Sequence, residues 1–120
     1  MRPEVYFDDK IEVLRIKVVG EFSREELAES ITSIKQMLKS TENRNILADI
    51  TDSARVLPPK EDRKSMVEMA KDLDWHKIAV VGADPVLRIT SKVILAVMGK
   101  YKEARFFKTE DEALAWLKGD

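Results

Sequence analysis

Three aspartates follow two short apolar runs and are the residues best placed to do chemistry. Asp49 and Asp52 lie at the end of the run at 46–50, and Asp84 follows the run at 78–81. If these runs are parallel strands, their carboxyl ends form the edge at which open α/β sheets bind ligands. Three carboxylates there could hold Mg²⁺ and support phosphoryl transfer. Turn formation and helix capping explain Asp52 and Asp84 without any metal, so a metal or phosphoryl site is the third of three hypotheses.

Other catalytic patterns are missing from the sequence. His76 is the single histidine and there are no cysteines, which excludes a histidine cluster for zinc, disulfides and thiol chemistry. No Gly-x-Gly-x-x-Gly loop, Walker loop or Gly-x-Ser-x-Gly elbow occurs. We expect His76 to be structural or exposed. The sequence predicts a binding protein that is not an enzyme and that holds no cofactor and no metal.

Length and composition predict one small domain spanning residues 1–120. Apolar residues make up 44% of the chain, enough for a core, and no Pro/Gly/Ser-rich stretch could act as a linker. The 21 basic and 22 acidic residues nearly cancel, so no overall positive field attracts nucleic acid. The chain has no apolar run of membrane-spanning length, and its first residues do not lead into a signal-type segment. We expect no transmembrane segment, no nucleic-acid partner and a cytoplasmic location.

Hydrophobic periodicity places the candidate residues in a β-β-α-β-α-β-α-β-α order. Residues 5–7 and the alternating residues 11–19 predict a hairpin that ends at Gly20. Further strands are predicted at 46–50, 78–81 and 104–107, with a loop at 51–57. Helices are predicted at 24–39, after Pro58-Pro59, after Pro85 and after Thr109. Strands alternating with helices indicate an α/β fold whose sheet is mostly parallel after the N-terminal hairpin.

Capping signals precede three of these helices. Ser23 with Glu26, and Thr109 with Glu112, have the spacing of a capping box, in which two side chains satisfy free backbone N–H groups. Asp84 can cap the helix that begins at Pro85. These signals predict where the helices start.

The helix after Pro85 is more apolar than one buried face requires. A core-facing stripe needs about three or four apolar positions in two turns, and this helix has far more: Val86, Leu87, Ile89, Val93, Ile94, Leu95, Ala96, Val97 and Met98. Either the helix is buried between neighbours, or it forms a surface patch for self-association, an apolar ligand or a membrane face. A homodimer through this helix and peripheral membrane contact are further expectations.

Several segments together form a recognisable pattern: the strand-turn-strand opening, Gly20-Glu21-Phe22-Ser23, and residues 46–51, 78–82, 104–107 and 113–117. In these segments the chain resembles the SpoIIAA-like family, which is similar to STAS domains (sulfate transporter and anti-sigma-factor antagonist domains). The resemblance covers nearly the whole chain and implies a (βα) superhelix. Its motifs are structural rather than catalytic, so it implies a fold more directly than a function.

The resemblance and the apolar third helix together lead to our first hypothesis, which is an apolar small molecule or lipid. SpoIIAA-like proteins are thought to bind nonpolar or lipid-like molecules. The ligand would lie between the second and third helices, against Met66, Met69, Leu87, Ile94 and Met98. Methionine suits such contacts because it packs against varied shapes. Trp75 and Trp116 would either line this site or fill the core.

The second hypothesis is a regulatory protein-interaction module of the anti-sigma-factor-antagonist type. The resemblance implies a kinase-type partner and a switch serine where the helix after strand 46–50 begins. Here Asp52-Ser53-Ala54 comes sooner after the strand and lacks the glycine of the family motif, and Pro58-Pro59 occupies the helix start. The predicted partner surface covers residues 52–60 and includes Asp52, Ser53, Arg55 and Pro58, and Ser65 is a further candidate for phosphorylation.

Overall fold

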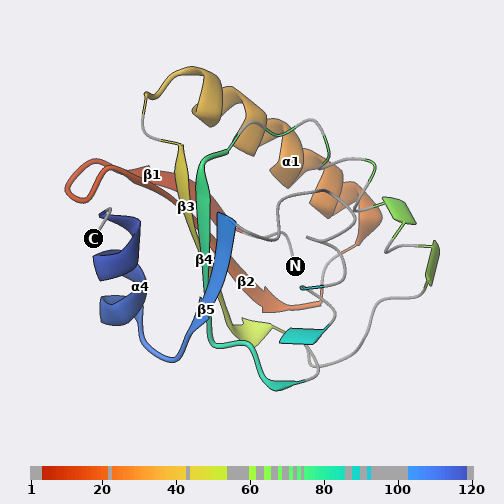
Figure 1. The fold of residues 1–120 in the computed structure, drawn as a ribbon. Coiled ribbons are helices and arrows are strands. Elements are labelled where there is room, and N and C mark those ends of the chain that lie inside the picture. The colour runs from red at the N-terminus through yellow and green to blue at the C-terminus, as the bar shows by residue number, and fades with distance from the viewer. Residues whose placement is uncertain are drawn as a thin grey trace.

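The computed structural model of the chain contains a five-stranded sheet (Figure 1). It describes residues 4–21, 23–42, 44–53, 60–61, 64–65, 68, 71, 73, 75–85, 88–89, 92 and 103–118. The strands lie side by side in sequence order: β1 (Glu4–Asp8), β2 (Val13–Gly20), β3 (Asn45–Ser53), β4 (Lys77–Val81) and β5 (Ala104–Phe107). β1 and β2 form an antiparallel hairpin, and β2 to β5 are parallel. The predicted mostly parallel sheet after an N-terminal hairpin is confirmed.

Helical segments alternate with these strands as predicted. α1 (Arg24–Lys39) has the predicted bounds, and α4 (Glu110–Leu117) follows β5. Between β3 and β4 the described residues 60–61, 64–65 and 68 are helical. After β4, residues 85, 88–89 and 92 are helical. At these positions the second and third predicted helices are therefore confirmed.

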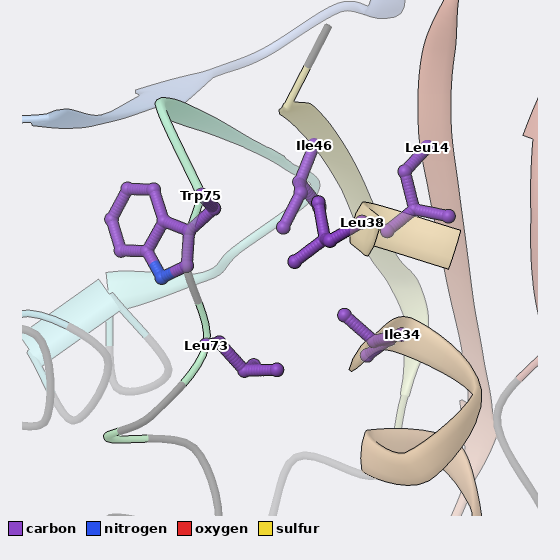
Figure 2. Close-up of a cluster of buried hydrophobic side chains, with 6 residues drawn as sticks. All are labelled: Leu14, Ile34, Leu38, Ile46, Leu73 and Trp75. Atoms are coloured by element: carbon purple, nitrogen blue, oxygen red, sulfur yellow. The ribbon is translucent and has the colours of Figure 1, made fainter. Parts of the chain in front are cut away.

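The sheet separates two clusters of buried side chains. α1 packs on one face, where the first cluster consists of Leu14, Ile34, Leu38, Ile46, Leu73 and Trp75 (Figure 2). α4 covers the opposite face (Figure 1), where the second cluster consists of Val13, Leu47, Ala79, Val81, Ala113 and Leu117. Successive side chains of a strand point to opposite faces, so β2 and β3 each contribute to both clusters. Trp75, only 3% exposed, belongs to the core.

The first of the two predicted capping boxes is complete and the second is half formed. The Ser23 hydroxyl accepts the N–H of Glu26 at 3.1 Å, and the Glu26 carboxylate accepts the N–H of Ser23 at 2.9 Å. At α4 the Thr109 hydroxyl accepts the N–H of Glu112 at 3.2 Å. The Glu112 carboxylate lies 3.2 Å from the same hydroxyl rather than on the backbone N–H of Thr109. Both helices nevertheless begin where the sequence predicts.

We expect Glu26→Gln to destabilise the fold at neutral pH and to have a smaller effect in acid. The backbone N–H of Ser23 donates to the Glu26 carboxylate and lowers the pKa of Glu26 below its ordinary value of 4.5. A carboxyl whose pKa is lowered by folding stabilises the folded state above its unfolded pKa. That contribution is lost as the pH falls through the lower, folded pKa. Urea unfolding of wild type and variant at neutral pH and at about pH 3 measures the difference.

Glu25→Gln is the matched control for this change. Glu25 lies in the same first turn of α1, where a negative charge also interacts with the helix dipole, but its carboxylate does not close the capping box. A loss of stability in Glu26→Gln that stayed the same in acid, or that Glu25→Gln reproduced in full, would contradict the role assigned to Glu26.

Candidate functional site at the carboxyl end of β3

β3 is longer than the sequence predicts. The predicted loop at 51–57 is wrong for its first three residues, because Thr51, Asp52 and Ser53 continue the strand. Asp52 pairs with Val19 of β2, and Ser53 pairs with Gly20. Pairing with a neighbouring strand overrides the local turn preference of aspartate and serine. The end of β3 is therefore an ordered part of the sheet.

A β-bulge shapes this end of β3. Asp49 is opposite Lys17, but Asp52 is opposite Val19, so β3 contains one residue more than β2 across this stretch. The Asp49 carboxylate accepts the backbone N–H of Thr51 at 3.0 Å. This hydrogen bond lies within the bulged stretch of β3 and fixes the backbone there. Thr51 and Asp52 are exposed to solvent.

Gly82 supports the bulge from the neighbouring strand. Gly82 directly follows β4 and has a φ of +86°, in the left-handed region that favours glycine. A Cβ built at this position would lie 2.1 Å from the Thr51 Oγ1 atom and 2.6 Å from the Thr51 Cα atom. Only glycine fits between the two backbones, so the ends of β3 and β4 are in direct contact at this point.

The three aspartates of the metal hypothesis play separate roles. Asp49 accepts the Thr51 N–H, Asp52 is exposed, and the Asp84 carbonyl accepts the N–H of Arg88 at 2.9 Å at the start of the third helix. Among the described residues, no group of three acidic or histidine side chains is arranged to hold a metal ion. The geometry therefore gives the third hypothesis no support.

Several predicted site residues lie outside the described residues. These include all five contacts of the lipid hypothesis, Met66, Met69, Leu87, Ile94 and Met98, and two residues of the partner surface, Arg55 and Pro58. The lipid site therefore stays a prediction. Of the partner surface, the structure describes the exposed Asp52 and Lys60, and the backbone of Ser53 at the last position of β3.

Two cationic side chains in the described part of the third helix lie close to Phe106 of β5. The Arg88 guanidinium and the Lys92 ammonium lie 5.7 Å and 5.8 Å from the centre of the Phe106 ring, within the range of cation–π contacts. Ile89, between them in sequence, is 66% exposed. Ile89 is thus an apolar residue of this helix that faces solvent in the isolated chain.

A concave site lies at the opposite end of the sheet. A hollow of about 600 Å³ opens between the β1–β2 turn, the amino ends of β2, β3 and β4, and the last turn of α4. Its most buried residues are Val13, Asn45 and Leu117. Its charged residues come from separate stretches of the chain around 9–12, 42–44, 76–77 and 118.

Side chains at the starts of β3 and β4 build one wall of this hollow by holding the end of α4. The Asn45 Nδ2 donates to the Leu117 carbonyl at 2.8 Å, and the Lys77 Nζ donates to the Trp116 carbonyl at 3.4 Å. The last carbonyls of a helix have no hydrogen-bond partners within it. These two contacts therefore supply partners for carbonyls of α4 and also position the helix. The Lys77 ammonium also lies 5.2 Å from the centre of the Trp116 ring.

His76 lies at the mouth of the hollow. Its side chain is exposed, as the sequence suggested, and its backbone N–H donates to the Arg44 carbonyl at 2.9 Å. Sequence reasoning missed this hollow because no single motif contains its residues. The parallel register that sets Asn45 opposite Lys77 is what brings the segments together.

Solved structures with the same fold define the class of protein. A SpoIIAA-like-fold protein of the DUF3478 family from Shewanella loihica PV-4 has a TM-score of 0.69 and 18% identity, covering 96% of this chain and 91% of that one. RsbS from Moorella thermoacetica, in a form with a serine-to-glutamate substitution, has a TM-score of 0.65 and 16% identity, covering 98% and 96%. At these identities the likeness establishes the fold alone, which is the STAS-like α/β fold.

The family profile described as SpoIIAA-like matches residues 13–118. The chain belongs to the SpoIIAA-like family, as its resemblance indicated. No curated protein matches it significantly in sequence. Within the described residues, no helix is both long and apolar enough to cross a membrane.

Proposed function

We propose that this chain is a regulatory protein-interaction module of the anti-sigma-factor-antagonist type, and that the end of β3 contacts its partner. The relation of the SpoIIAA-like family to the anti-sigma-factor antagonists and the likeness to the RsbS fold support a protein partner. The observation that carries the proposal is the bulged, exposed end of β3, where Asp52 stands beside the last paired residue, Ser53. The five contacts of the lipid hypothesis lie outside the described residues, so that hypothesis stays a prediction.

Rigidity makes the end of β3 suitable for recognition. The Asp49–Thr51 hydrogen bond and the contact with Gly82 limit the conformations of this segment before any partner arrives. A surface that is already ordered loses less conformational entropy on binding. The exposed Asp52 carboxylate would pair with a cationic group of the partner and would contribute to specificity and association rate.

Ser53 is the position at which a charge switch would act. Its backbone is fixed by pairing with Gly20, and a phosphate there would add about −1.5 to −2 charges next to Asp52. The added negative charge would strengthen the attraction of this surface for a cationic group of the partner. Ser65 is less suitable, because its hydroxyl donates to the Glu61 carbonyl one helical turn earlier, at 3.2 Å.

A capture experiment tests the role of the β3 end. The tagged chain, Asp52→Lys and Asp111→Lys would each be mixed with extract of the source organism, and captured proteins would be quantified by mass spectrometry. Asp111 is the matched control because it is also an exposed aspartate but lies in the first turn of α4. We expect a protein that the wild type and Asp111→Lys retain equally and that Asp52→Lys retains about tenfold less, because a matching charge is reversed.

Ser53→Asp should increase retention of the same protein, because it adds a second negative charge where the partner's cationic group would bind. Circular dichroism of each variant would check that the fold is intact. Equal retention by all variants would refute a partner contact at the β3 end, and the absence of any specifically retained protein would refute the interaction module.

A further inference from the structure

We propose that the hollow at the amino ends of β2, β3 and β4 binds a small free organic carboxylate with an apolar body. The hollow has about 600 Å³, and small-molecule sites usually measure about 300–1,000 Å³. It lies at the end of the sheet opposite Asp52 and Ser53, so the inference does not depend on the partner contact proposed above.

The arrangement of charges in the hollow favours an anion. Of the charged lining residues that the structure describes, only Arg44 and Lys77 are half-buried, and both are cations. The acidic residues Asp9, Glu12 and Glu42 are all exposed at the rim. A charge removed from water interacts more strongly with a ligand than a fully solvated one. A negative group therefore gains more from the inner cations than a positive group would gain from the acidic residues at the rim.

Lys77 retains donors for such a ligand. An ammonium group has three N–H donors, and the hydrogen bond to the Trp116 carbonyl uses one of them. That bond and the contact with the Trp116 ring hold the lysine in place at the start of β4. A carboxylate within reach of Lys77 and Arg44 would receive charge-assisted hydrogen bonds.

Apolar side chains complete the site. Ile11 and Leu114 are half-buried in the wall of the hollow, and Val13 and Leu117 are buried behind them. Burial of apolar surface contributes about 25 cal/mol per Å². A ligand with a hydrocarbon body would gain from these contacts, whereas a bare ion such as acetate would not. The combination of inner cations and an apolar wall is the reason for choosing an amphipathic carboxylate.

NMR titration of the full ¹⁵N-labelled chain tests the inference, with octanoate as the probe. We expect saturable shifts of the amides around Ile11, Asn45 and His76, with much weaker effects from octan-1-ol and from acetate. Arg44→Gln should weaken octanoate binding about tenfold, the typical effect of losing one charge-assisted contact. Lys118→Gln, at the exposed rim, should weaken it less and serves as a second variant if Arg44→Gln does not fold. Lys108→Gln, an exposed lysine outside the hollow, should bind octanoate like the wild type.

Other outcomes would overturn the inference. Octanoate shifts centred away from the hollow, or equal affinity in Arg44→Gln, Lys118→Gln and wild type, would contradict it. Sedimentation with vesicles of phosphatidylcholine and phosphatidylglycerol, without binding of free octanoate, would indicate a lipid headgroup site and would also contradict it. Asp52→Lys should bind octanoate normally, so failure of this inference and failure of the proposed partner contact can be told apart.

Discussion

Gly82→Ala is expected to lower the free energy of unfolding by about 3 kcal/mol, from strain at a left-handed residue together with overpacking. The added Cβ would lie 2.1 Å from the Thr51 Oγ1 atom and 2.6 Å from the Thr51 Cα atom. Rotation of the threonine side chain can relieve the first contact, but the second involves backbone. The ends of β3 and β4 would therefore have to separate. Urea unfolding followed by circular dichroism measures the loss.

Gly20→Ala is the matched control for this prediction. Gly20 also has a positive φ, +65°, but a Cβ at that position would meet no atom within 4 Å. Gly20→Ala should therefore lower the free energy of unfolding only by the backbone strain, about 1 kcal/mol. The double variant Gly82→Ala/Thr51→Gly should recover part of the loss, because it removes two of the three close atoms. Equal losses for Gly20→Ala and Gly82→Ala would show that the β3–β4 contact is not as tight as described.

Leu14→Ala is expected to lower the free energy of unfolding by about 3 kcal/mol, within the range measured for leucine truncations in protein cores. Leu14 is completely buried, at 0% exposure, in the cluster between the sheet and α1. It lies on β2, opposite Phe7 of β1 and Ile46 of β3, so a cavity there has rigid walls that cannot easily collapse. Whole domains are stable by only about 5–15 kcal/mol, so this loss would be a large fraction of the total.

Ile89→Ala provides the comparison for the core variant. Ile89 is similar in size but 66% exposed, so its truncation should change stability by no more than about 0.5 kcal/mol. Thermal and urea unfolding of both variants would give the two values. A loss in Ile89→Ala as large as that in Leu14→Ala would mean that Ile89 is covered in solution, for instance by a second copy of the chain.

The sequence by itself determined the elements and most of the fold. Alternation in β2 and the apolar runs of β3 and β4 identified the inner strands, because residues covered on one or both faces leave a local pattern. Ser23 and Glu26 marked the start of α1, because a capping box involves residues only three positions apart. The strand–helix order then restricted the sheet to a mostly parallel arrangement, and the segments that resemble the SpoIIAA-like family lie within the profile match.

Only the tertiary structure decided how the ends of the strands are built. Asp52 and Ser53 have the composition of a loop, yet they extend β3 because Val19 and Gly20 of β2 pair with them. The need for glycine at position 82 depends on Thr51, which is distant in sequence. The hollow likewise depends on strand register, which sets Asn45 opposite Lys77 and brings both to the end of α4. Such features arise from contacts between segments far apart in the chain, and local patterns carry no record of them.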